Sequence, residues 1–279
     1  MATVNEKMTA IADAIRSKTG KEDKMTLDDM ANEIKNLKNE GPVVVQLEDG
    51  TIIECANDKV MSIREDCFEN WVFLEKVSFP NALSVNARSF NGCVALKEIY
   101  MPNLTQCAIT AFQSCQSLET VDFPRCVKGS TQSAFAGCKN LKHINLPLVK
   151  ILYSSTFSGC SSLEEVFFPS VTTLYGYVFS GCSNLKKADF DKVFTFFKEY
   201  AFLACPSLET LILRFESHPV SLSSINNFEN TPIANGTGYI YVPKALIEDY
   251  KVATNWITFA DQFRAIEDYP EICGGAENG

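Results

Sequence analysis

A phenylalanine recurs along the chain at intervals of 22 or 23 residues, and this spacing limits the possible folds more than any other feature of the sequence. Each Phe begins a variant of one pattern, Phe-x-x-Cys-x-x-Leu-x-x-(Val/Ile)-x-(Phe/Leu), and in five of the seven copies a proline follows directly. The seven aligned positions are Phe68, Phe90, Phe112, Phe135, Phe157, Phe179 and Phe202. Self-similarity at such a period is typical of a solenoid, in which each repeat forms one coil.

The apolar residues of each copy predict how a coil is built. The Leu, the Val or Ile, and the last Phe or Leu point inward from a bend and a short strand, and the proline then ends the strand. A single coil cannot bury this face, but stacked coils pair their strands edge to edge at about 4.8 Å per step and enclose a continuous core. We therefore predict a solenoid with a parallel sheet of short strands and few helices over residues 59–215.

The repeated cysteines have two possible explanations. They form a column in which Trp71 holds the slot of the first copy, followed by Cys93, Cys115, Cys138, Cys160, Cys182 and Cys205. One explanation is a small buried hydrophobe with a weak thiol donor, repeated because every coil has the same narrow slot. The other, metal binding or redox chemistry, favours Cys-x-x-Cys pairs or nearby histidines, and the chain has only His143 and His218. We prefer the first explanation and expect neither a metal nor a cofactor.

Both ends of a solenoid need a cover. Residues 41–58 predict a β cap, a hairpin turned at Asp49-Gly50 that docks on the first coil. Residues 1–40 predict a helical hairpin, either an attachment or oligomerising module or a segment packed against that cap. Residues 216–267 predict a C-terminal cap with a last strand before Pro243, and the acidic, Gly-rich residues 268–279 predict a disordered tail.

Charge and hydropathy exclude two classes of partner. The net charge of −9 disfavours nucleic acid, because binding phosphates requires a clustered positive field. No apolar run approaches the roughly 18 residues that span a bilayer, so we expect no membrane insertion. Charged residues interrupt the apolar ones near the N-terminus, from which we expect no Sec-type signal peptide.

The repeat resembles a known family. The string Ala-Phe-x-x-Cys-x-x-Leu-x-x-Ile-x-x-Pro begins here at Ala134-Phe135 and, with Val in place of Ile, at Ala111-Phe112. It is similar to the BspA-like class of bacterial leucine-rich repeats over residues 58–214, and the segment Ile240-Tyr241-Val242-Pro243 looks like their closing segment. The resemblance implies a right-handed leucine-rich-repeat solenoid. It also implies a surface adhesin that binds host matrix proteins or other cells, normally with an export signal.

A shorter resemblance concerns the N-terminus. Residues 11–20 and 25–30 are similar to the openings of tail-associated proteins in phages and prophages of gut Gram-positive bacteria. Together with the expected lack of a Sec signal, this resemblance implies a virion or prophage component, or a bacterial surface protein that leaves by a non-Sec route.

The predicted outer face of the sheet carries an alternating column of charges directly after each repeated Leu: Glu75, Lys97, Glu119, Lys142, Glu164, Lys186 and Glu209. On adjacent parallel strands each charge has neighbours of opposite sign, which favours a surface salt ladder. Because the charges cancel along the column, this ladder also argues against an anionic polymer as ligand.

Exposed aromatic rings are the candidate ligand-binding residues. Tyr100 and Phe167 lie in the next outward column of the sheet, which also contains Ser78, Asp122, Asn145, Asp189 and Ile212. On the opposite wall, the spacing assigns equivalent places in three successive repeats to Tyr153, Tyr175 and Phe197, while Tyr177 and Tyr200 each lie two residues before a repeated Phe. These rings either stack into a ladder that only stiffens the solenoid or stay exposed and contact a protein or a sugar face.

Catalysis has little support. The sequence shows no Gly-x-Ser-x-Gly elbow, no phosphate loop and no His-rich metal set. Glu119 and Asp122 form an isolated acid pair for which we expect no pocket, and His143 is expected to be solvated. We therefore predict a non-catalytic recognition or adhesion module that binds a protein or carbohydrate. The alternative is a structural spacer or assembly protein whose contacts are made by the N-terminal helical hairpin.

Overall fold

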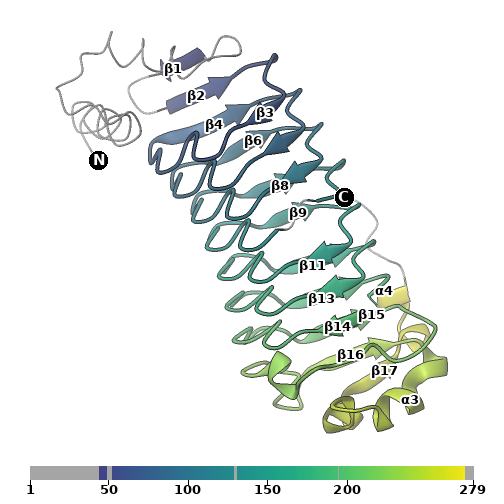
Figure 1. The fold of residues 1–279 in the computed structure, drawn as a ribbon. Helices are drawn as coiled ribbons and strands as arrows, with labels where there is room; N and C mark the ends of the chain where they lie inside the picture. Colours follow the sequence, from purple (N-terminus) through teal and green to yellow (C-terminus); the bar gives the residue numbers. More distant parts are fainter. Residues whose placement is uncertain (1–43, 49–51, 129–130, 194, 274–279) are drawn as a thin grey trace.

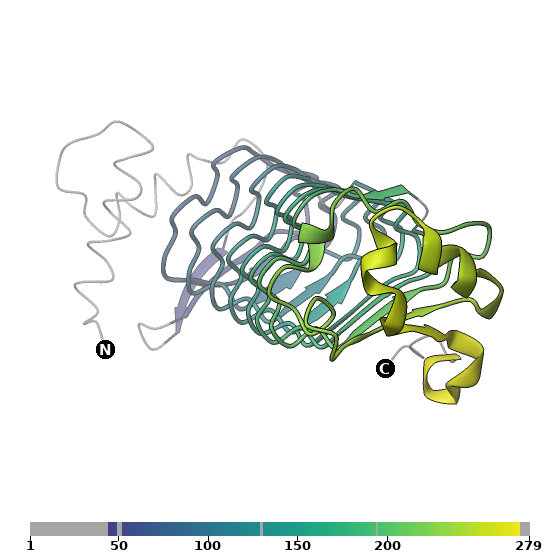
Figure 2. The ribbon, with the colours of Figure 1, turned by 90° about the horizontal axis from the view of Figure 1, so that it is seen from below.

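The computed structural model describes residues 44–48, 52–128, 131–193 and 195–273 (Figure 1). The helical hairpin predicted for residues 1–40 lies outside these ranges, as do residues 274–279 of the predicted tail. The described chain winds into a regular stack of coils, and a view turned by 90° shows the coils behind one another with the C-terminal helices at the near end (Figure 2). The solenoid predicted from the repeat is confirmed.

Each coil places one strand on a common face, here called the strand wall. Its strands are β2 (Ile52–Ala56), β4 (Leu74–Ser78), β6 (Glu98–Tyr100), β8 (Thr120–Asp122), β9 (His143–Asn145), β11 (Glu165–Phe168), β13 (Lys187–Phe190), β15 (Thr210–Leu213), β16 (Tyr239–Val242) and β17 (Phe263–Ala265). They are hydrogen-bonded in three groups, β1-β2-β4-β6, β8-β9 and β11-β13-β15-β16-β17. All ladders are parallel except that of β1 (Val44–Glu48) with β2, the hairpin expected at the N-terminal cap.

A second set of short strands forms the opposite face, here called the return wall. These strands are β3 (Ser62–Ile63), β5 (Ser84–Val85), β7 (Gln106–Cys107), β10 (Ile151–Leu152), β12 (Thr173–Leu174) and β14 (Thr195–Phe197). They pair in parallel as β3-β5-β7 and β10-β12-β14. Chain segments with tight turns then lead back to the strand wall, and the core lies between the two walls.

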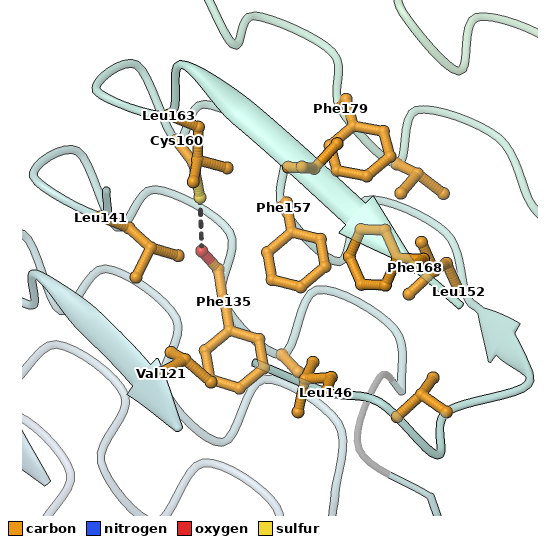
Figure 3. Packing of buried hydrophobic residues seen from close by; sticks show 14 of the residues in the cluster. Val121, Phe135, Leu141, Leu146, Leu152, Phe157, Cys160, Leu163, Phe168 and Phe179 are labelled. Atoms are coloured by element: carbon orange, nitrogen blue, oxygen red, sulfur yellow. Dashed lines mark hydrogen bonds between the residues drawn. The ribbon is translucent and has the colours of Figure 1, made fainter. Parts of the chain in front are cut away.

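The repeated phenylalanines form one continuous stack along the core. Neighbouring ring centroids lie 5.0 Å apart for Phe68 and Phe90 and 5.5 Å apart for Phe135 and Phe157. Both of the latter rings point into the same interior as the ladder leucines (Figure 3). Because each ring packs on the equivalent ring of the next coil, the stack fixes the register of the coils as well as burying apolar surface.

The ladder cysteines link successive coils by hydrogen bonds. Each ladder thiol donates to the carbonyl of the repeated Phe in the coil before it, as Cys160 does to Phe135 at 3.2 Å (Figure 3) and Cys93 does to Phe68 at 3.0 Å. The ladder thiols are buried, and burial raises the pKa of Cys138 to about 12. They stay protonated donors near neutral pH, as expected of small buried residues with a weak thiol donor.

The stack of coils continues one turn beyond the predicted end at residue 215. Phe228, in η1 (Ile225–Phe228), stacks on Phe202 at 5.8 Å, and buried Thr231 takes the place of the ladder cysteine. Between them Asn230 has a left-handed backbone with φ of 60°, as Gly159 and Gly181 have at the same point of their coils. Because 26 residues separate Phe202 from Phe228, the period of 22 or 23 residues does not reveal this coil.

The C-terminal cap is built from short helices and the last strand. They are η2 (Lys244–Leu246), α3 (Ile247–Val252), η3 (Trp256–Gln262), η4 (Ile266–Asp268) and α4 (Pro270–Cys273). The Trp256 indole donates to the Val220 carbonyl, and the Tyr250 hydroxyl accepts from the Val220 amide at 3.0 Å. The disorder expected from residue 268 onward is wrong for residues 268–273, because α4 buries Ile272 against the strand wall.

Candidate functional site

The outward side chain after the inward Val or Ile of each strand forms a column along the strand wall, here called the outer column. Its members are Ser78, Tyr100, Asp122, Asn145, Phe167, Asp189, Ile212 and, from β16, Tyr241. Within each hydrogen-bonded group of strands, the parallel pairing places equivalent side chains of adjacent strands about 4.8 Å apart. The solvent exposure of each member therefore shows which part of the strand wall is open and which is covered.

At its C-terminal end the outer column is covered by the chain itself. Asp189 and Ile212 are 1% and 0% exposed, whereas the sequence pattern placed both on an open face. Ile212 packs with Tyr241, Ile266 and Ile272 in a small cluster on the outside of the sheet. The expectation of an outward-facing column is wrong here because residues 266–273 fold back over the strands.

An ion pair on the strand wall holds the covering segment through a hydrogen bond to Ile272. The Arg214 guanidinium donates to both carboxylate oxygens of Asp189 at 2.9 and 2.8 Å, and one of the same nitrogens donates to the Ile272 carbonyl at 2.7 Å. The hydrogen bond with Asp189 raises the pKa of Arg214 above its usual value. This fork joins the strand wall to α4.

The N-terminal half of the outer column is open. The Tyr100 side chain is 58% exposed and stands over β6, between the smaller Ser78 and Asp122 on the flanking strands. A hollow of about 650 Å³ lies around it. Its lining is Lys76, Val77, Ser78, Lys97, Glu98, Ile99, Tyr100, Glu119, Thr120 and Asp122. The expectation of no pocket beside Glu119 and Asp122 is therefore wrong.

The charges around this hollow are mostly paired with each other. Lys97 contacts Glu75 at 3.1 Å and Lys142 contacts Glu119 at 3.0 Å, so each of these lysines bonds the glutamate one coil earlier. Lys76 also pairs with Glu98, at 3.1 Å. The predicted salt ladder exists as separate pairs rather than a continuous chain, and each exposed pair stabilises the fold by about 0.2–1 kcal/mol at most.

The predicted tyrosines of the return side are arranged in two stacked pairs. Tyr153 and Tyr175 have ring centroids 5.3 Å apart with planes at 17°, and Tyr177 and Tyr200 are 5.1 Å apart at 20°. Tyr153 and Tyr177 remain partly exposed. Because each ring covers one face of its partner, the stacked-ladder explanation fits these four residues better than a sugar platform does.

The last two predicted site residues are less exposed than expected or out of place. Phe167 in β11 is only half-exposed. A register shift between β12 and β14 pairs Phe197 with Leu174, so the predicted equivalence of Phe197 with Tyr175 is wrong. Lys198, whose amide donates to the Leu174 carbonyl as that of Tyr175 donates to the Leu152 carbonyl, takes the equivalent place instead.

Comparison with known proteins identifies the repeat. The model of the BspA type leucine rich repeat region matches six copies over residues 61–170 and 148–238, which is more than half of the chain. The chain is a BspA-type leucine-rich repeat protein. The match extends to residue 238 and so includes the coil that contains Phe228. A search of curated proteins gave no match.

One solved structure supports the same fold, and two others are less similar to the chain. A leucine-rich repeat protein from Bacteroides ovatus is 20% identical with a TM-score of 0.55, and the match covers 69% of this chain and 55% of that one. A leucine-rich cell surface protein from Faecalibacterium prausnitzii is 18% identical, with a TM-score of 0.47 and coverage of 70% and 57%. The T. pallidum leucine-rich repeat protein is 24% identical, with a TM-score of 0.49 and coverage of 61% and 91%. The chain thus matches little more than half the length of the first two.

The described residues of the BspA-type protein hold neither a metal-ligand cluster nor a membrane-spanning helix. In the ranges that the structure describes, no three His, Cys, Asp or Glu residues are placed to hold a metal. Those ranges also contain no helix that is long and apolar enough to cross a bilayer. Leucine-rich repeats as a class present extended surfaces to other proteins.

Proposed function

We propose that this BspA-type protein is a non-catalytic recognition module that binds a protein ligand at the hollow centred on Tyr100. The proposal rests on one observation. Tyr100 is 58% exposed and stands on a parallel sheet inside a hollow of about 650 Å³. Tyrosine is one of the residues that dominate binding energies at protein interfaces, because it supplies a large amphipathic area at low entropic cost.

The surroundings of Tyr100 support a protein ligand. Hot spots are typically ringed by energetically neutral contacts that exclude water, and the lysine–glutamate pairs around Tyr100 suit that role. The paired charges also cancel each other's field, which disfavours a polyanion such as nucleic acid. The sheet itself is preorganised by the phenylalanine stack beneath it, so little ordering entropy is lost on binding.

A selection with defined probes tests this proposal. Peptides selected from a phage-displayed random library on the folded full-length chain are synthesised, and their Kd values are measured with the wild type, Tyr100→Ala and Tyr153→Ala. We expect Tyr100→Ala to weaken binding about 30-fold, the effect of losing a hot spot of about 2 kcal/mol. Tyr153→Ala, which removes a partly exposed tyrosine from the other wall, is expected to leave Kd unchanged.

Other outcomes overturn the proposal. Peptides that bind both variants equally, or a selection that yields no binder, favour the spacer whose contacts are made by residues 1–40. Binding on a glycan array that Tyr153→Ala or Tyr177→Ala abolishes would assign recognition to carbohydrate on the tyrosine pairs. Adhesion at a bacterial surface or in a phage tail remains the biological setting that we propose for such a module.

A further inference from the structure

Asp122 differs from the other carboxylates that line the hollow. Glu98 pairs with Lys76 and Glu119 with Lys142, so a lysine neutralises each of them. The exposed Asp122 instead accepts a hydrogen bond from the Asn145 amide at 2.7 Å, a neutral partner. Asp122 therefore brings a negative charge to the hollow that its described partner does not compensate.

This carboxylate and the Tyr100 ring occupy equivalent places on successive strands of the wall. Both belong to the outer column, Tyr100 at the end of β6 and Asp122 at the end of β8, and both line the hollow. An aromatic ring attracts a cation over its face, and an aspartate accepts two parallel hydrogen bonds from a guanidinium. A planar cation that enters the hollow can meet both groups at once.

The same face already binds guanidinium groups elsewhere. Arg214 forks onto Asp189, a member of the outer column like Asp122, and its nitrogen also bonds a carbonyl of the covering segment. Near the same end, the Arg264 guanidinium lies 4.3 Å from the centroid of the Tyr239 ring. Each contact that an arginine would make in the hollow thus has an internal counterpart on the strand wall.

We infer that the hollow binds an arginine side chain of the protein ligand, with its guanidinium over the Tyr100 ring and its fork on the Asp122 carboxylate. This inference rests on the proposed function and names the chemistry of the ligand. Arginine is preferred over lysine because a planar, weakly hydrated fork suits both the ring and the carboxylate, whereas an ammonium is a compact, strongly hydrated point charge. The net charge of −9 on the chain also complements a basic segment of a partner.

The test uses peptides that depend on Tyr100 in the selection above. Each arginine is replaced in turn by lysine or by citrulline, a neutral analogue of nearly the same shape, and Kd is measured with the wild type, Asp122→Asn and Glu165→Gln. We expect one arginine whose change to citrulline weakens binding at least 10-fold in the wild type, with lysine intermediate. Asp122→Asn is expected to reduce that discrimination to the few-fold preference that the Tyr100 ring alone gives a cation.

Glu165→Gln is the matched control, because it removes one exposed carboxylate from the same wall outside the hollow. Discrimination that is as large in Asp122→Asn as in the wild type, or that falls equally in Glu165→Gln, overturns the inference and attributes the preference to general charge. Peptides that depend on Tyr100 but contain no essential arginine also overturn it while leaving the proposed function intact. If no peptide depends on Tyr100, the proposed function itself fails.

Discussion

The two halves of the outer column share one backbone geometry and differ in what covers them. In the half with β6 and β8, Tyr100 and Asp122 face solvent in a hollow. In the half with β13 and β15, Asp189 and Ile212 are buried beneath residues 266–273. An aspartate in the outer column is therefore a surface group in one half and one member of a buried ion pair in the other.

The two halves show that strand register determines the direction of a side chain but not its exposure to solvent. The covered half shows what the wall accepts from the covering segment: an apolar contact on Ile212, a ring on Tyr241 and a carbonyl on the Arg214 guanidinium. The open half has a ring and a carboxylate in the same column, and among the described residues no such segment lies over them. The covered half thus serves as an internal example of a bound polypeptide.

The largest expected effect separates the two aspartates. Asp189→Ala leaves the mostly buried Arg214 guanidinium without its carboxylate, which costs about 3–5 kcal/mol of unfolding free energy. Asp122→Ala removes an exposed acceptor and is expected to cost less than about 1 kcal/mol. Urea unfolding followed by circular dichroism measures both variants, and similar losses in the two would show that the covering segment does not distinguish the halves.

A smaller effect tests the covering segment itself. Ile272→Ala removes a buried side chain from α4 and is expected to lower the free energy of unfolding by about 2 kcal/mol, the low end for a buried Ile because the site is at the edge of the fold. Ile257→Ala, in which the side chain is 59% exposed, serves as the control and is expected to change it by less than about 0.5 kcal/mol. An Ile272→Ala variant as stable as the control would mean that α4 does not hold the cover in place.

The interior of the solenoid was predictable because it repeats. The Phe and Leu columns recur in all seven copies of the repeat and the Cys column in six, so each inward position is repeated too often to be a coincidence. The alternation of Glu and Lys after each Leu likewise predicts the pairs on the strand wall. The coil with Phe228 escaped notice because an insertion lengthens its spacing and Thr231 replaces the cysteine.

The surroundings of an outward side chain were predictable only where the neighbouring coils alone determine them. The cover over Ile212 depends on residues some 60 positions later in the chain, as the Arg214–Ile272 bond shows, and no local pattern announces such a contact. The displacement of Phe197 arises from a one-residue shift in backbone pairing, which the 22-residue spacing does not reveal. Tyr100 was found because it stands at an outward position, but the hollow around it depends on the sizes of its neighbours.

The two halves share the column of buried ladder thiols in the core. Burial raises the pKa of Cys138, beneath the open part of the wall, and of Cys205, beneath the covered part, to about 12 from an ordinary 9. An unfolded chain loses these protons above pH 9 while the folded chain keeps them, so stability is complete below pH 9 and falls as the pH rises toward 12. Each thiol contributes roughly 1 kcal/mol per pH unit to that fall. Cys138→Ala and Cys205→Ala are therefore expected to reduce the fall of the unfolding free energy with pH by the same amount, measured by urea titrations at pH 8, 10 and 11 under reducing conditions.

A reduction in only one of the two variants would show that the cover on the outer face also changes the interior. The contrast between the halves would then extend beyond the surface.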